Sequence, residues 1–187
     1  MKRRIKQILS AVLVAIMLVG VMPITSFAED DEKTFGYFEY EISDGEVSIT
    51  GCDTSISGEL TIPETVEGYP VTSIGLGAFE ECSDLTSVTI SNNVTSIADI
   101  AFSGCNRLAS VIIPDNVASI GDGVFSYCTD LTSIMVSKNN KIYDSRNNCN
   151  AIIETGINRL IAGCKNTVIP NDIAIIGYRA FNGCTDL

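Results

Sequence analysis

The sequence predicts a repeat solenoid built mainly from parallel β-strands, with short helical or 3₁₀ turns. Three consecutive segments of 23 residues, 71–93, 94–116 and 117–139, share one pattern, and the middle segment spells it as VTSIADIAFSGCNRLASVIIPDN. A fourth copy, IAIIGYRAFNGCTDL, begins at Ile173. Each full copy contains a short run of alternating or β-branched apolar residues, such as 111–113, which favours a strand. Self-similarity at a fixed period of this length is typical of stacked repeats.

The apolar positions of the repeat form columns along the chain. A coil of 23 residues cannot bury these side chains alone, whereas stacked coils place each one against its own copy, roughly 4.8 Å away. Phe79 and Cys82 are three residues apart, so one helical or 3₁₀ turn points both inward. The columns are Ile74, Ile97, Ile120 and Ile176; Phe79, Phe102, Phe125 and Phe181; Leu85, Leu108 and Leu131; Val88, Val111 and Ile134; and Ile90, Ile113 and Val136.

The pattern V-T-S-I-G-x-x-A-F-x-x-C-x-x-L-T-S-V-x-I-P resembles the BspA-like leucine-rich repeats of bacterial secreted and surface proteins. The resemblance covers about residues 60–187, and it departs from the pattern only mildly, with Ser91 and Ser137 in place of Pro and Val124 in place of Ala. It implies a leucine-rich-repeat horseshoe. It also implies extracellular adhesion or ligand binding, which is a looser implication than the fold.

The first 28 residues have the three parts of a secretory signal peptide. Lys2, Arg3, Arg4 and Lys6 form a basic region, residues 8–22 are apolar, and Ser26 and Ala28 place small residues before a cleavage point. The alternative is an uncleaved membrane anchor, which is disfavoured because the apolar run is short for a membrane span. The mature chain is then expected to begin at Glu29 and to be secreted or exposed on the cell surface.

The mature chain is strongly acidic. Four of the 12 lysines and arginines, but none of the 23 acidic residues, lie in residues 1–28, so eight basic residues against 23 acids leave a formal charge of −15. This balance argues against nucleic acid and against anionic lipid as partners. Solubility of an exported protein explains the acidity most simply. Attraction of a basic partner is the alternative.

Residues 29–59 differ from the repeats and are expected to form an acidic start and an N-terminal cap over the first coil. Their aromatic residues and the alternating segment GEVSIT, around residues 47–50, favour strands, and Asp44-Gly45 suits a hairpin turn. A degenerate repeat precedes Val71, with a strand at 60–62 and a small insertion at 67–70. The solenoid proper is therefore assigned to residues 60–187.

Residues 138–171 interrupt the period with a longer repeat variant. Two apolar runs, 151–153 and 159–162, flank Thr155-Gly156-Ile157-Asn158 and predict a β-hairpin. We expect this hairpin to decorate the solenoid, which resumes at 168–170; a dedicated binding loop is the alternative. Because the chain stops at Leu187, where another strand is due, we also expect a fragment of a longer protein.

The residue types exclude most catalytic chemistry. The chain contains no histidine, so Ser-His-Asp and Cys-His nucleophile systems are unavailable. No C-x₂-C pair, phosphate-binding loop or dinucleotide motif is present, so no metal or cofactor is expected. Glu80 and Glu81 are adjacent on a turn and suit a solvated face better than an acid–base pair. The Asn93-Val94-Thr95 sequon is already explained by the repeat pattern.

Seven cysteines are unusual enough to need an interpretation in an exported protein. Cys82, Cys105, Cys128 and Cys184 occupy one repeat position, where parallel Cβ vectors about 4.8 Å apart suit free buried thiols better than disulfides. Cys149 and Cys164 flank the inserted hairpin and could pair with each other. Cys52 has no evident partner.

The candidate binding face follows from the alternation of side chains along each strand. With Val88 and Ile90 inward, the residue between them points outward in every coil. The resulting outer column is Thr61, Thr89, Ile112, Met135 and Val168. Isolated exposed apolar residues are ordinary, but a contiguous apolar column on a repeat sheet is typical of a partner site.

Together these observations predict a non-catalytic secreted or surface protein that mediates protein–protein binding or adhesion. The expected partner is an extracellular or host protein, or a glycan, with no nucleic acid and no membrane insertion after removal of the signal. The alternative is a structural spacer or targeting region of a larger secreted enzyme.

Overall fold

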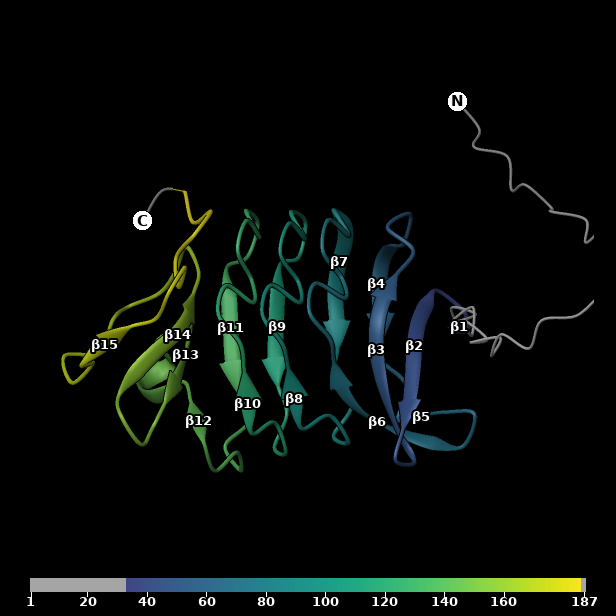
Figure 1. The fold of residues 1–187 in the computed structure, drawn as a ribbon. Helices are drawn as coiled ribbons and strands as arrows, with labels where there is room; N and C mark the ends of the chain where they lie inside the picture. The colour runs from purple at the N-terminus through teal and green to yellow at the C-terminus, as the bar shows by residue number, and fades with distance from the viewer. Residues whose placement is uncertain (1–32, 186–187) are drawn as a thin grey trace, which may run out of the picture. The chain divides into compact units, whose positions relative to one another are not determined.

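The computed structural model describes residues 33–185. The predicted signal peptide and the mature start at Glu29 lie outside the described residues. Fifteen strands and one short 3₁₀ helix make up the described part, and most of the strands stack side by side along the solenoid (Figure 1). Their bounds are β1 Lys33–Phe35, β2 Phe38–Ser43, β3 Glu46–Cys52, β4 Ser57–Thr61, β5 Thr65–Val66, β6 Tyr69–Ile74, β7 Asp84–Thr89, β8 Ser96–Ile97, β9 Ser110–Ile113, β10 Ser119–Ile120, β11 Ser133–Val136, β12 Tyr143–Asp144, η1 Arg146–Asn148, β13 Ala151–Glu154, β14 Arg159–Gly163 and β15 Ile175–Ile176.

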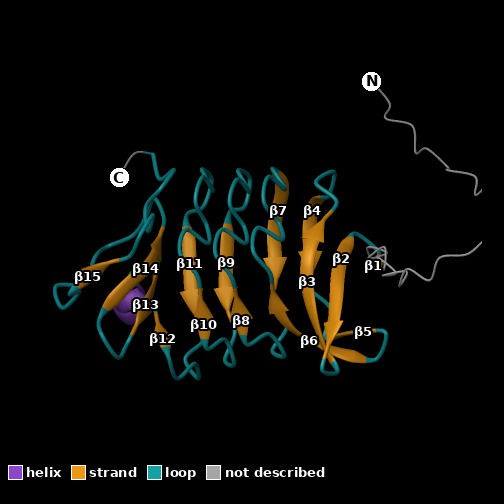
Figure 2. Ribbon diagram, viewed as in Figure 1, coloured by secondary structure: helices purple, strands orange, loops and turns teal. Residues whose placement is uncertain are grey.

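Each 23-residue coil contributes one strand to each of two sheets. The first sheet runs β1-β2-β3-β6-β8-β10, with β5 paired to β6, and the second runs β11-β9-β7-β4. All pairs between coils are parallel and stay in repeat register: Ile97 pairs with Ile74 and Ile120, and Val111 pairs with Val88 and Ile134. The predicted parallel solenoid with almost no helix is confirmed (Figure 2).

The predicted columns form the core between the two sheets. Phe79, Phe102 and Phe125 stack, with ring centroids 4.9 and 5.6 Å apart and interplanar angles of 4° and 17°. Ile74, Ile97 and Ile120 are buried. The columns that begin with Leu85, Val88 and Ile90 are buried as well. The fourth copy differs. Ile176 is 49% exposed and pairs with Leu160 of the inserted hairpin instead of with Ile120, and Phe181 is only partly buried, against the smaller cluster of that hairpin.

The turn that carries phenylalanine and cysteine closes without a regular helix, as the short segment predicts. Cys82 N–H donates to Phe79 O at 3.3 Å, and the same bond recurs between Cys105 and Phe102. Several turn positions have positive φ, and one of them is Ile100 at φ 50°. A β-branched residue is rarely found there, so the repeat turn imposes its conformation on the side chain that occupies it.

The segment expected to form the cap contains an antiparallel pair of strands. β2 and β3 pair across the Asp44-Gly45 turn, and β3 then pairs in parallel with β6 of the first regular coil. Phe38 in β2 meets Phe79 edge to face, with centroids 6.2 Å apart. The cap therefore extends the aromatic column with a residue that lies outside the repeat pattern.

The inserted segment forms the predicted hairpin, with β13 and β14 antiparallel. The expectation that it merely decorates the solenoid is wrong. Ile152 and Ile161 are buried in the main core, while Ile153 and Leu160 form a smaller cluster with Cys149, Ala151 and Ala180. The hairpin therefore continues the stack, because its two apolar faces replace the surfaces that a regular coil would supply.

Candidate functional site

The outer face of the β4-β7-β9-β11 sheet carries most of the predicted column. Thr61 pairs with Thr89, and Ile112 pairs with Met135, so these side chains stand on one face of neighbouring strands. Ile112 is 60% exposed and Met135 is 50% exposed, while Val111 and Ile134 beside them are buried. The strand alternation thus turns two large apolar side chains outward at adjacent positions.

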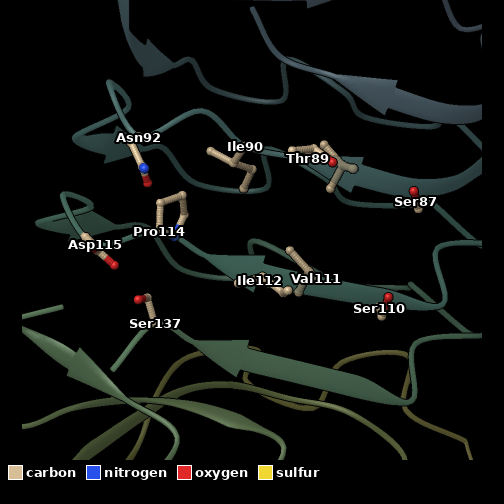
Figure 3. Close-up of a pocket in the computed structure, with 11 residues that line it drawn as sticks. Ser87, Thr89, Ile90, Asn92, Ser110, Val111, Ile112, Pro114, Asp115 and Ser137 are labelled. Atoms are coloured by element: carbon tan, nitrogen blue, oxygen red, sulfur yellow. The ribbon is translucent and has the colours of Figure 1, made fainter. Parts of the chain in front are cut away.

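A shallow groove of about 490 Å³ lies across this face. Figure 3 shows Thr89, Ile112 and Ser110 on the strands, with Asn92 and Asp115 on the turns that follow β7 and β9. Asp115 accepts a hydrogen bond from Asn139 Nδ2 at 3.1 Å. Hydrogen bonds from Ser137 and Asn139 hold the pKa of Asp115 below its ordinary value, so the groove keeps a negative charge at its end.

A second hollow of about 410 Å³ lies beside β11, between Met135 and the inserted segment. Lys138 and Arg146 line it. Arg146 is held in place by Asp144 at 3.0 Å and Asp172 at 2.6 Å. The hydrogen bond that Arg146 Nε donates to Asp144 Oδ1 is the main cause that raises the pKa of Arg146. Met135 therefore lies between a groove that ends at Asp115 and a hollow lined by Lys138 and by the ion pair of Arg146 with Asp144.

Charge is divided unevenly along the solenoid. Residues 33–130 contain 15 acidic and two basic residues, whereas residues 131–185 contain three acidic and six basic residues. The formal charges of the two parts are therefore −13 and +3. Asp115 and Lys138, which line the two hollows, lie near the boundary between the acidic and the basic part.

Val168 does not join the sheet with the other predicted residues. It is 72% exposed, lies outside every strand, and donates its N–H to Cys149 O at 3.0 Å. The inserted segment occupies the side of β11 that the alignment assigns to Val168, and Val136 N–H donates to Ser145 Oγ there at 3.0 Å. The column that shares the sheet is Thr61, Thr89, Ile112 and Met135.

The cysteines behave largely as their positions predict. All seven are free thiols, and the predicted column of Cys82, Cys105 and Cys128 is buried. Cys105 Sγ donates to Phe79 O at 3.2 Å, and Cys128 Sγ donates to Phe102 O at 3.1 Å. The pairing considered for Cys149 and Cys164 is not formed in the structure.

Among residues 33–185, no group of three or more Cys, Asp or Glu side chains is arranged to hold a metal ion. Glu80 and Glu81 are exposed on a turn, as expected. Over the same range, no helix has the length and hydrophobicity needed to cross a membrane.

Sequence reasoning missed the polar ends of the face. Asn92 and Asp115 follow their strands directly, so their place beside the column could have been inferred from the repeat. Lys138 occupies the same repeat position one coil further on, so its place follows in the same way. Arg146 approaches Met135 because the inserted segment folds back against β11, and nothing local in the sequence indicates that contact.

Comparison with known proteins identifies the class. Residues 53–187 match the family described as BspA type leucine rich repeat region, with six copies, so the chain belongs to that family. The match begins slightly before the resemblance inferred from the repeats, and it includes the degenerate first coil. No curated protein matches the sequence.

Several solved structures are similar. A leucine rich cell surface protein from Faecalibacterium prausnitzii is 21% identical over 83% of this chain and 68% of its own, with a TM-score of 0.47. The T. pallidum leucine rich repeat protein is 20% identical over 83% and 90%, with a TM-score of 0.42. The pneumococcal vaccine antigen PcpA is 13% identical over 83% and 62%, with a TM-score of 0.40.

Proposed function

We propose that this chain is a secreted or cell-surface binding protein that holds an extracellular protein or glycan on the outer face of the β4-β7-β9-β11 sheet and catalyses no reaction. The single observation that carries the proposal is the adjacent pair of outward apolar side chains, Ile112 and Met135, beside a groove with polar ends. Large apolar side chains at paired positions do not stabilise a strand face that is exposed only to solvent.

The composition of the face supports binding over chemistry. Thr89 and Ser110 offer hydroxyl groups on neighbouring strands. Ile112 and Met135 offer apolar surface that a partner can cover. Asp115 and Lys138 add opposite charges at the edges of the face. Apolar contact with a charged rim is the common arrangement of a protein interface. The same hydroxyl and amide groups suit a glycan, which is why both partner classes are kept in the test.

The test compares binding by wild type and by the double variant Ile112→Glu with Met135→Glu. Wild-type protein is titrated onto immobilised extracellular-matrix proteins and a glycan array, and the double variant is then measured on every surface that binds. We expect at least a tenfold loss of affinity, because two buried charges without partners each disfavour the complex.

A matched control is Leu76→Glu, which changes a side chain that is 69% exposed and lies on the turn after β6. It should bind like wild type. Full binding by the double variant, with an unchanged circular dichroism spectrum, would move the site away from this sheet. No binding by wild type to any surface would instead favour a spacer or targeting role.

A further inference from the structure

The side chains that contain sulfur are divided between the core and the candidate face. Beyond the predicted signal peptide the chain contains seven cysteines and one methionine, Met135. Five of the cysteines are buried, and the other two are only partly exposed. Met135 is 50% exposed on β11, where it pairs with Ile112 of β9. The most exposed side chain with a sulfur atom is therefore the one on the candidate face.

Hydrogen bonds favour the protonated form of the thiols. Six of the seven donate their proton to a backbone carbonyl oxygen, and the seventh, Cys82, is completely buried. Peroxides react with the thiolate, which a thiol forms less readily when its proton is bound to an acceptor. Burial also raises the pKa of Cys149 and of Cys184. The six donors are Cys52, Cys105, Cys128, Cys149, Cys164 and Cys184.

The thioether of Met135 is under neither constraint. It has no proton to lose before it reacts, so its reactivity depends on access to the sulfur atom. The strand alternation turns this side chain outward, and it also lines the hollow beside β11. An oxidant in solvent therefore reaches the sulfur of Met135 more readily than that of any cysteine.

We propose that Met135 is a site of oxidative modification by a peroxide, and that the resulting sulfoxide weakens binding at the outer face of the β4-β7-β9-β11 sheet. The second part rests on the proposed function. A lone pair of the Met135 sulfur attacks one oxygen of hydrogen peroxide, so that an S–O bond forms and the O–O bond breaks. The hydroxide that leaves takes the proton from the transferred oxygen and becomes water. The sulfur loses two electrons and the peroxide gains them.

The sulfoxide changes the chemistry of the face where a partner would cover it. Its oxygen is a hydrogen-bond acceptor beside the apolar side chain of Ile112, and covering it without a donor costs free energy. In the free protein the ammonium group of Lys138, which lines the same hollow as Met135, can donate to this oxygen. The oxidised side chain is thus stabilised toward the hollow and away from Ile112.

The first measurement identifies the oxidised residue. The purified mature chain is treated with hydrogen peroxide at neutral pH, its thiols are blocked in denaturant, and its peptides are mapped by mass. Tryptic cleavage after Arg107 and Lys138 releases residues 108–138, and fragmentation distinguishes Met135 from Cys128. We expect one added oxygen atom on Met135 while all seven thiols remain blockable. Oxidation of a cysteine before Met135 would overturn the assignment of the site.

The second measurement compares reduced and oxidised protein on the immobilised protein or glycan that binds the wild type. We expect the affinity to fall roughly tenfold on oxidation, which is the loss produced by one buried acceptor without a partner. Treatment with methionine sulfoxide reductase should restore it. Met135→Leu is the matched control, because it has no sulfur at this position. Its affinity, whatever the starting value, should be the same before and after peroxide.

Each part of the proposal has its own contrary result. Unchanged affinity after complete conversion of Met135 to the sulfoxide would overturn the effect on binding. Loss of affinity in Met135→Leu after peroxide would assign the effect to another residue and would overturn it as well. If the reduced wild type binds no surface, the proposed function fails and the effect on binding fails with it. The peptide map still decides by itself whether Met135 is the oxidised residue.

Discussion

Replacing Phe102 with alanine tests the stacked core most severely. Phe102 is fully buried and lies between Phe79 and Phe125, with ring centroids 4.9 and 5.6 Å away. Truncating a buried phenylalanine costs about 3–5 kcal/mol. We expect a value toward the upper end, because strand pairing fixes the spacing of the coils and prevents the neighbouring rings from closing the cavity.

The assay is unfolding by urea and by heat, followed by circular dichroism. For a domain of this size, 1 kcal/mol shifts the unfolding temperature by roughly 2–4 °C, so the variant should unfold about 6–20 °C lower. Phe35→Ala is the control, because Phe35 is 46% exposed on β1 and should change the midpoint little. An unchanged midpoint for Phe102→Ala would refute the proposed stacking of the coils.

Three further predictions follow from the turns, the thiols and a buried phenol. Gly123→Ala should lower the free energy of unfolding measured in urea by roughly 1–2 kcal/mol, because φ is +64° and the new Cβ would lie 2.9 Å from Ser126 Oγ. Gly156→Ala is the control: its new Cβ meets open space, so the free energy of unfolding should not change. Cys105 and Cys128 should resist alkylation in native protein and react only in denaturant; rapid native labelling would contradict their burial. Burial raises the pKa of Tyr143, so the folded state keeps its proton where the unfolded state ionises, and the free energy of unfolding should fall as the pH rises above about 10. Tyr143→Phe should lose that pH dependence, and a urea midpoint series with the same alkaline slope in both proteins would argue against it.

The repeat columns could be predicted from the sequence because each depends on one local period. Phe102 contacts its own copies in the coils on either side, so aligning the segments already places it. Ile112 and Met135 follow from the same register and the alternation of side chains in a strand. The candidate face was therefore predictable wherever the coils are regular.

The remaining contacts depend on segments that do not repeat. Phe38 extends the phenylalanine column from a strand with no matching pattern, so no alignment reveals its contact with Phe79. Val168 fits the pattern of a strand end, yet the inserted segment lies between it and β11. How deeply the hairpin enters the core depends on long-range packing, which hydrophobic periodicity does not determine.

Protection of Met135 tests the central claim most directly. It is the only methionine beyond the predicted signal peptide, and half of its side chain is exposed on the candidate face. The measurement is hydroxyl-radical footprinting of the free protein and of its complex with the protein or glycan that binds the wild type. It compares oxidation of Met135 with oxidation of Tyr178, which is 65% exposed and lies outside this sheet. We predict that oxidation of Met135 falls severalfold on binding while that of Tyr178 is unchanged. Equal oxidation of Met135 in the free and bound protein would contradict binding at the sheet.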